Sequence, residues 1–352
     1  MSIAKTSKSI LWFSRGHGFG HVMKDLSIAK KLQEMDPDIS VLFASYAQGT
    51  QVLERNSFPF FDLHLPPNNP FFETLLRAGR LIHAYRPTVV ISHEEFAAIP
   101  ASRLFNIPVL FITHWFLDSE HFLMQSLACA DQILFIEEPG HFKVPPYLVR
   151  KVEYIGPVLR PFAYTLKDKP KARQELKITD DTLVISVFPG VWSESVAPSF
   201  QIVLEAFSIL PFEKRLLIWI GGSDASRLQK KVANRANVII KESDWQIDRL
   251  MVATDLAITK ANYTTVLELD ALGIPSIALL HGHNPIDEVY AKQRKTVIPM
   301  ELYSLSPEAL AQTMENILRC PPPPDTSRVE TLSKGIECAA QFIKNFIHAY
   351  ST

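Results

Sequence analysis

The sequence is poor in several features that would each indicate a particular class of protein. Its 352 residues include only three cysteines, which are far apart and lack metal-ligand spacing, so they predict no disulfide framework. Lys and Arg number 36 against 37 Asp and Glu, and a net charge of -1 without a basic surplus excludes nucleic acid as a partner. No apolar run approaches the roughly 18 residues of a membrane span or forms a signal peptide. We therefore expect a soluble, cytoplasmic protein.

What is present is a repeated alternation of apolar runs with helix-like segments. The chain is longer than a single core usually serves, and 47% of its residues are hydrophobic. Short buried strands separated by helices are typical of parallel sheets covered on both faces. A lysine-rich stretch, Lys167 to Lys177, interrupts the alternation, and we interpret it as a linker. The expected strands are Ser9–Phe13, Val41–Ala44, Thr88–Ser92, Val109–Thr113, Gln132–Phe135, Leu183–Phe188, Arg215–Ile220, Asn237–Ile240, Leu256–Thr259 and Ser276–Leu280.

The predicted fold class is α/β, with two Rossmann-like, doubly wound parallel-sheet domains facing a central cleft. We place the first domain at residues 1–163 and the second at residues 164–335, with a final helix over 336–352. A serine cap and a proline predict a further helix over Ser306–Leu318.

A glycine-rich turn follows the first expected strand. Gly16, Gly18 and Gly20 let the backbone turn sharply and approach a ligand, and the next helix starts at His21. His21 is a candidate base or anion ligand, with a simple helix cap as the alternative, and His17 is a weaker candidate. A dinucleotide fingerprint is disfavoured, because His21 replaces its third glycine and no acid ends the next strand.

A second turn of the same form follows Leu256–Thr259. Asn262 can cap the helix that it opens, and Thr264 and Thr265 offer hydroxyl and N–H groups in the first turn. Glu268 lies four residues after Thr264, on the same helix face, where a carboxylate can accept both hydroxyls of a ribose. The alternative is an acid that merely stabilises the positive end of the helix.

Other segments that leave expected strands are candidate ligand loops. Asp287 and Glu288 can accept hydrogen bonds from a sugar, or they can be a solvated pair that opens a helix. The Phe188–Ser193 segment, with Gly190, is a candidate phosphate loop, and Gln246, beside Trp245, can present its backbone to a base. His114 ends a strand and can orient an acceptor or be structural.

Neither an Asp-x-Asp motif nor a paired-histidine or Cys/His motif stands out, so we expect no metal and no cofactor. The aromatic segments Phe71-Phe72 and Trp115-Phe116-Leu117 are either core or an exposed patch for a lipid acceptor or a lid.

These motifs, in this order, resemble those of the GT-B glycosyltransferases, and most of all the lipid-linked N-acetylglucosaminyltransferase (MurG-like) family. The matching segments are Gly16 to His21, Ser92 to Phe111, Gly156 to Arg160, Thr259 to Pro275 and His283 to Glu288. The resemblance implies that Glu268 binds ribose, that the segment around Gln246 meets uracil, and that the final helix crosses back to the first domain. The chain departs from the family at Asn262-Tyr263, at Asp287-Glu288 and at Phe188-Pro189-Gly190.

We therefore predict metal-independent transfer of a sugar from a nucleotide-activated, UDP-linked donor to a hydroxyl acceptor, with His21 as base. A lipid-linked acceptor and a peripheral contact with the inner face of a membrane stay open. The run from His21 to Leu26 also resembles the UDP-sugar hydrolase of pseudaminic acid synthesis, so hydrolysis is one alternative. A non-catalytic nucleotide-sugar-binding protein is another.

Overall fold

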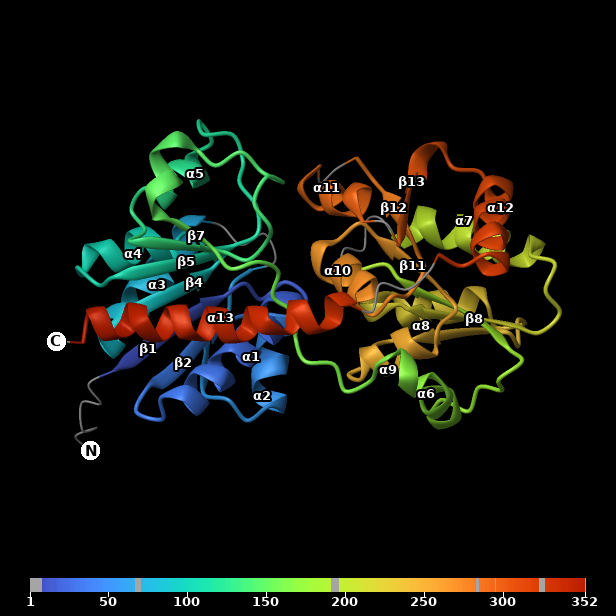
Figure 1. Ribbon diagram of the computed structural model, residues 1–352, viewed down its shortest axis with the longest axis horizontal. Helices are drawn as coiled ribbons and strands as arrows, with labels where there is room; N and C mark the ends of the chain where they lie inside the picture. The colour runs from blue at the N-terminus through green and yellow to red at the C-terminus, as the bar shows by residue number, and fades with distance from the viewer. Residues whose placement is uncertain are drawn as a thin grey trace. The chain divides into compact units, whose positions relative to one another are not determined.

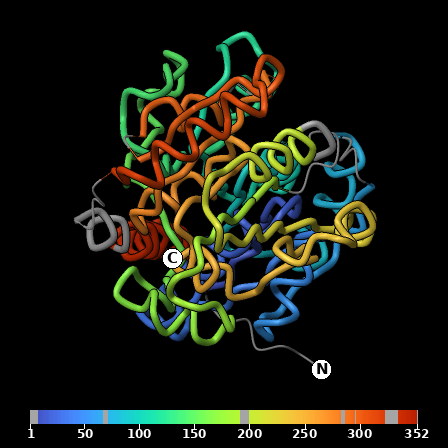
Figure 2. Tube along the Cα trace, turned by 90° about the vertical axis from the view of Figure 1, so that its right-hand side faces the viewer, coloured from blue at the N-terminus to red at the C-terminus, as the bar shows by residue number. Residues whose placement is uncertain are grey.

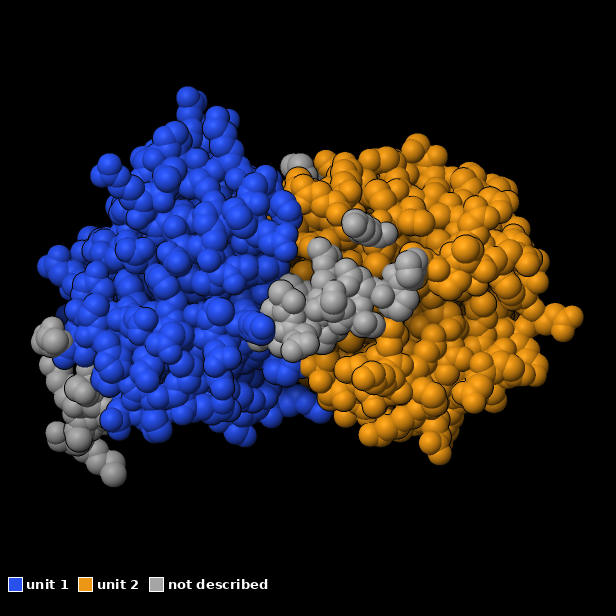
Figure 3. All heavy atoms as spheres, in the orientation of Figure 1, with its two compact units in different colours: residues 1–161, 331–352 blue, residues 162–330 orange. Residues whose placement is uncertain are grey.

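The computed structural model describes residues 8–66, 71–190, 196–282, 285–294, 296–322 and 327–351. The chain divides into two compact units (Figure 3). Unit 1 consists of Met1–Pro161 with Thr331–Thr352, and unit 2 of Phe162–Glu330. Part of the candidate phosphate loop (Val191, Trp192 and Ser193) and His283 lie outside the described residues.

Unit 1 contains a seven-stranded sheet in which every pairing is parallel (Figure 1). The strand order is β3-β2-β1-β4-β5-β6-β7, so the chain reverses its direction of winding between β1 and β4. The strands are β1 (Ser9–Ser14), β2 (Ser40–Ser45), β3 (Phe60–Asp62), β4 (Val89–His93), β5 (Val109–Thr113), β6 (Gln132–Phe135) and β7 (Val152–Tyr154).

Helices cover the sheet of unit 1 because its central strands are apolar on both faces. Ile10 and Trp12 point to the face that α1, α2 and α13 cover, while Leu11 and Phe13 are buried on the other. The last helix contributes Ala339, Ile343 and other side chains to this core. The helices are α1 (Gly20–Met35), α2 (Gln48–Arg55), α3 (Phe71–Tyr85), α4 (Ala98–Leu104), α5 (Phe122–Leu127) and α13 (Ser327–Ala349).

Unit 2 contains a six-stranded parallel sheet with the order β10-β9-β8-β11-β12-β13. Numbered within the unit, this is the 3-2-1-4-5-6 order of a dinucleotide-binding fold, with the reversal between β8 and β11. The strands are β8 (Leu183–Phe188), β9 (Arg215–Ile220), β10 (Val238–Lys241), β11 (Leu256–Lys260), β12 (Ser276–Leu280) and β13 (Val297–Glu301).

On one face of this sheet α7 packs beside α12 (Figures 1 and 2). Their apolar side chains share one core with β8, β9 and β11. The predicted serine cap of α12 is confirmed, because Ser306 Oγ accepts a hydrogen bond from Ala309 N at 3.1 Å. The helices are α6 (Lys169–Glu175), α7 (Val196–Ile209), α8 (Ala225–Lys231), α9 (Ile247–Ala253), α10 (Tyr263–Ala271), α11 (Pro285–Gln293) and α12 (Pro307–Arg319).

The interpretation of Lys167 to Lys177 as a linker was wrong. Most of this stretch forms a short 3₁₀ turn and then α6, which packs against α9 in unit 2. Lys167, Lys171 and Lys177 are exposed, but Ala172 and Arg173 are buried. Lys169 and Arg173 donate hydrogen bonds to the two carboxylate oxygens of Asp255, at 2.7 and 2.6 Å. The lysine-rich composition of this stretch therefore hid the signal of α6, a helix with one buried face.

Candidate active site

The glycine-rich turn after β1 is held closely against the chain that follows β2. A Cβ atom on Gly16 would lie 1.9 Å from the carbonyl oxygen of Tyr46, so only glycine fits at this position. Gly18 has a φ of 78°, in the left-handed region, and His17 packs edge-on against Tyr46 with ring centroids 5.1 Å apart. This turn ends at Gly20, the first residue of α1, and fixes the start of the helix that carries His21.

The sheet order brings the ends of three strands together beside His21. β1 lies next to β4 and β4 next to β5, so the residues that follow them meet at the carboxyl edge. His93 ends β4, Glu94 follows it, and His114 follows β5. The ligand atoms of His21, His93, Glu94 and His114 all lie within 4.8 Å of one another. This four-residue group, the histidine–glutamate cluster, occupies the reversal point, where ligands of open α/β sheets bind.

Glu94 is the centre of the cluster. Its Oε2 lies 3.0 Å from His21 Nε2, and its Oε1 lies 2.9 Å from His114 Nδ1. Thr113 Oγ1 donates a hydrogen bond to Oε1 at 3.2 Å, and Arg15 Nη1 lies 3.7 Å from Oε2. Glu94 itself has a φ of 57°, an unfavourable conformation for a residue with a side chain. The backbone strain is tolerated where the carboxylate is held from several sides.

The electrostatics of the cluster favour an ionised Glu94 between neutral His21 and His114. Burial opposes the ionisation of Glu94, but His114 and His21 outweigh it and hold the pKa of this carboxyl well below its usual value. Burial lowers the pKa of His21 to about 3, although Glu94 pulls in the opposite direction. Burial likewise lowers the pKa of His114 and, with help from Arg15, that of His17. At neutral pH these rings are free of charge and each keeps one lone pair.

A second pair lies behind the cluster. His93 is completely buried, and its Nδ1 lies 2.6 Å from Asp25 Oδ1, while Ser14 Oγ donates a hydrogen bond to Asp25 Oδ2. A carboxylate oxygen only accepts, so this contact places a proton on His93 Nδ1, and Nε2 faces away from Asp25. Among the described residues, His93 Nε2 has no hydrogen-bond partner. Leaving such a buried atom unsatisfied costs about 1–3 kcal/mol, which calls for an explanation.

In unit 2 the second motif folds as expected. Asn262 caps α10 by accepting a hydrogen bond from Thr265 N at 2.9 Å, and the helix ends before Gly273, whose φ is 68°. Thr264 and Thr265 are half-buried in the first turn, and Glu268 lies one turn further with an exposed fraction of 5%. An acid that only stabilises the positive end of a helix can do so from solvent, so the burial of Glu268 favours a further role for its carboxylate.

The remaining candidates of unit 2 also follow carboxyl ends of strands. Gly190, at a φ of 79°, follows β8, and a Cβ there would lie 3.9 Å from Asn262 Nδ2, so this turn approaches the start of α10. Asp287 Oδ1 lies 3.4 Å from Tyr263 N at the same helix start. Gln246 is exposed at the start of α9, after β10.

Glu288 makes hydrogen bonds to the backbone that the sequence did not predict. Its Oε1 accepts hydrogen bonds from His281 N at 3.0 Å and from Gly282 N at 2.7 Å. The side chain therefore holds the turn after β12, so Glu288 is more than a solvated acid that opens a helix, and its contact with a sugar stays a prediction.

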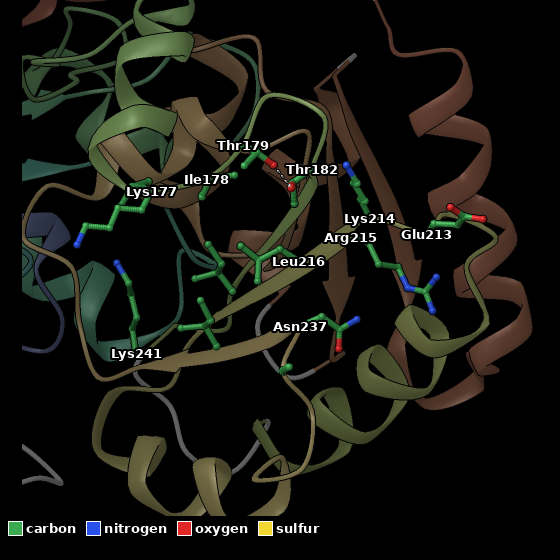
Figure 4. Close-up of a pocket in the computed structure, with 14 residues that line it drawn as sticks. Lys177, Ile178, Thr179, Thr182, Glu213, Lys214, Arg215, Leu216, Asn237 and Lys241 are labelled. Atoms are coloured by element: carbon green, nitrogen blue, oxygen red, sulfur yellow. Dashed lines mark hydrogen bonds between the residues drawn. The ribbon is translucent and has the colours of Figure 1, made fainter.

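A separate pocket of about 390 Å³ lies in unit 2 (Figure 4). It is lined by the turn before β8, by the start of β9 and by the edge strand β10, with Thr179 and Thr182 hydrogen-bonded at 2.7 Å on one wall. The turn before β8 and the start of β9 lie at the amino end of the sheet, opposite the candidate donor loops. This pocket is not part of the site.

The two aromatic segments separate in the structure. Trp115 and Phe116 are buried, with exposed fractions of 8% and 4%, so they belong to the core. Phe72 is 76% exposed, and Leu76 on α3 and Phe122 on α5 are also exposed, while Phe71 packs edge-on against Phe122. We call Phe72, Leu76 and Phe122 the apolar patch. Within the described residues no helix is long and apolar enough to cross a membrane.

Comparison with known proteins supports the resemblance seen in the sequence, although no family model matches the chain. The chain is 26% identical over 285 residues to the UDP-N-acetylglucosamine–N-acetylmuramyl-(pentapeptide) pyrophosphoryl-undecaprenol N-acetylglucosamine transferase of Desulforudis audaxviator, covering 73% of this chain and 74% of that protein. It is 22% identical to the Bacillus subtilis enzyme of the same name over 339 residues, which cover 87% and 89% of the two chains.

Solved structures agree on the fold. The structure of Acinetobacter baumannii MurG aligns with a TM-score of 0.59 at 16% identity, covering 97% of this chain and 99% of that one. The kitacinnamycin glycosyltransferase aligns with a TM-score of 0.69 at 14% identity, covering 97% and 98%.

The fold class predicted from the sequence, two parallel-sheet α/β domains of the GT-B type, is confirmed, and so is the class of enzyme, a glycosyltransferase. More particularly, the chain is similar to the MurG-like N-acetylglucosaminyltransferases.

Proposed function

We propose that the protein transfers a sugar from a UDP-linked donor to a hydroxyl group of a lipid-linked acceptor. The observation that supports the proposal is the start of α10, where a capped helix end, two half-buried threonines and buried Glu268 lie within two turns of one helix. The related enzymes from Desulforudis audaxviator and Bacillus subtilis are named as transferases with a UDP-sugar donor. This parallel supports transfer over hydrolysis.

The donor's diphosphate binds at the start of α10, where exposed N–H groups and the helix dipole favour negative charge. Thr264 and Thr265 add hydroxyl donors, Gly190 lets the preceding turn approach, and Glu268 accepts the ribose hydroxyls. Gln246 meets the base through its backbone, and Asp287 and Glu288, at the starts of α10 and α11, accept sugar hydroxyls. Backbone groups rather than a metal ion stabilise the departing diphosphate.

The acceptor's proton is taken by His21. Glu94 lies 3.0 Å from His21 Nε2 and fixes the tautomer with the proton on that nitrogen, so Nδ1 carries the lone pair. The acceptor oxygen forms its bond to the sugar's anomeric carbon as the bond from that carbon to the diphosphate oxygen breaks. The proton then passes to His21 and UDP leaves. His17, Gly18 and Gly20, in the turn before this base, and His114, whose ring centroid lies 6.3 Å from that of His21, hold the acceptor.

The apolar patch supports the lipid-linked acceptor and a peripheral contact with a membrane. Phe72, Leu76 and Phe122 expose apolar surface on two neighbouring helices of unit 1, the unit that carries the base. We expect the Phe72→Ser, Leu76→Ser variant to lose co-sedimentation with anionic phospholipid vesicles. Ile209→Ser, which changes an exposed apolar residue of unit 2, is the matched control.

The donor assignment is tested by binding and turnover in the same experiment. Glu268→Gln should weaken UDP binding about 10- to 100-fold, since it removes a hydrogen bond to a charged acceptor. Glu268→Gln should also reduce the ratio of the affinity for UDP to the affinity for 2′-deoxy-UDP. Glu205→Gln, on the exposed surface of α7, should change neither the UDP affinity nor this ratio. An unchanged preference in the Glu268→Gln variant would refute the ribose assignment.

Turnover distinguishes the remaining alternatives. UDP release that requires a lipid-linked acceptor supports transfer, while release in its absence identifies water as the acceptor. Binding of UDP-sugars without release under either condition identifies a non-catalytic binding protein. His21→Gln should lower kcat about 10²- to 10⁴-fold at nearly constant donor KM if His21 is the base.

A further inference from the structure

The histidine–glutamate cluster has a property that the transfer reaction does not use. Three imidazoles and one carboxylate from three segments of unit 1 converge with their ligand atoms within 4.8 Å of one another. Base catalysis needs only His21 and its partner Glu94. It leaves His93 Nε2, a completely buried atom without a hydrogen-bond partner among the described residues, unexplained.

His93 is oriented as a metal-binding histidine is. Its Nδ1 is held by the Asp25 carboxylate at 2.6 Å, and Ser14 in turn holds Asp25. A carboxylate on one ring nitrogen fixes the tautomer and ring orientation and makes the other nitrogen a better ligand. The His93 ring also packs edge-on against that of His21, with centroids 4.7 Å apart, so both rings border the same small volume.

We propose that His21, His93, Glu94 and His114 bind one divalent first-row metal ion, with Zn²⁺ as the best match. Three imidazole nitrogens and one carboxylate oxygen suit zinc, which binds these ligand types at about 2.0–2.2 Å in a tetrahedron. Ligand atoms around such an ion are about 3.4 Å apart. His21 and His114 already lie at 3.0 and 2.9 Å from the two oxygens of Glu94, so only small side-chain movements admit the ion.

The charges around the cluster permit a cation. Asp25, Glu94 and Glu95 are buried acids of this region, and Arg15 and Lys24 oppose them. Lys24 is buried, but the Arg15 side chain is 34% exposed and lies 3.7 Å from Glu94 Oε2, so it can move toward solvent when an ion enters. Removing the Arg15 charge should therefore tighten binding.

Binding of the metal has a consequence for the proposed base. An ion bound to Nε2 of His21 leaves the proton on Nδ1, and the ring then has no lone pair with which to accept a proton. Zinc and acceptor deprotonation by His21 exclude each other, so zinc inhibits transfer. This consequence rests on the proposed function, whereas the binding itself does not.

The first experiment measures binding on the full chain without donor or acceptor. Protein freed of metal with a chelator is titrated with Zn²⁺ against a chromophoric competitor, and with Co²⁺ while its visible spectrum is recorded. The expected result is one ion per chain with the intense visible absorption of tetrahedral cobalt and no thiolate band. The absence of a thiolate band excludes the exposed Cys129, Cys320 and Cys338 as ligands.

Variants assign the site. His93→Gln and His114→Gln should each weaken zinc binding by more than 100-fold, and Asp25→Asn, which alters only the orienting partner, should weaken it about 10- to 100-fold. His64→Gln is the matched control, because it removes an exposed histidine that lies 3.2 Å from a carboxylate, that of Asp62. Arg15→Gln should bind zinc more tightly than the unchanged protein does. A substitution that only destabilised the fold would not increase the zinc affinity.

Two results overturn the proposal: zinc binding weaker than millimolar in the unchanged protein, or binding that His93→Gln and His114→Gln leave intact. Urea unfolding verifies that unit 1, which contains every substituted residue, is folded in each variant. A protein that binds zinc but releases no UDP after its metal has been removed with chelator would refute the proposed function and keep this inference. UDP release by a protein that binds no zinc would support the proposed function and refute this inference.

Discussion

The pKa of His21 predicts a stability change that can be calculated. In the folded protein burial lowers this pKa from 6.5 to about 3, so at pH 5 the folded state keeps His21 neutral while the unfolded chain protonates it. The unfolded state then binds more protons, and stability must fall as the pH falls below 6.5. Between pH 7 and pH 5 His21 alone accounts for a loss of about 2 kcal/mol.

The measurement compares the unchanged protein with His21→Gln, whose side-chain amide can still donate a hydrogen bond to Glu94. Urea unfolding at pH 7, 6 and 5, with chelator present throughout, gives the free energy of unfolding for the transition that the substitution affects. The unchanged protein should lose about 2 kcal/mol more than His21→Gln on going from pH 7 to pH 5. Identical pH dependence in the two proteins would show that His21 titrates normally in the folded state, and would refute the argument.

Further predictions concern the packing of unit 1 and the pH dependence of transfer. Gly16→Ala should lower the melting temperature and abolish transfer, because its Cβ would lie 1.9 Å from the Tyr46 carbonyl oxygen; Gly79→Ala, whose Cβ would make an ordinary contact with Phe105 at 3.9 Å, is the comparison in the same melting assay. Ile343→Ala should destabilise unit 1 by about 2–5 kcal/mol in urea unfolding, since Ile343 is completely buried, whereas exposed Gln341→Ala should have little effect. The pH profile of kcat/KM should show no acid inflection near pH 6.5 from His21, and such an inflection that disappears in His21→Gln would contradict the lowered pKa.

Central strands were predictable because their local sequence and their burial agree. Val109–Thr113 and Ser276–Leu280 are uninterrupted apolar runs, and the structure has strands with those bounds, buried on both faces. The strands β3, β7 and β13 lie at sheet edges, and much of each is exposed, so their sequences lack that signal.

The site was predictable where one segment contains all the necessary groups. The turn that ends at His21 and the cap at Asn262 are local, and both fold as their sequences indicate. The cluster is different, because His93 and His114 reach His21 only through the neighbouring positions of β1, β4 and β5. The order of the strands in the sheet cannot be seen in the spacing of histidines and acids along the chain. For this reason the sequence motifs gave no indication of a metal site.

The C-terminal helix has a consequence for how the chain is made. Ala339, Ile343 and Ile347 complete the core of unit 1, whose strands are all synthesised before residue 155. During synthesis, the face of the first sheet that α13 will cover therefore stays without one of its covering helices until the whole of unit 2 has left the ribosome. An N-terminal domain usually folds first on the ribosome. Unit 1 therefore begins to fold first but can complete its core only after unit 2 has been synthesised. Until then, the apolar face of its sheet that α13 covers needs protection from aggregation.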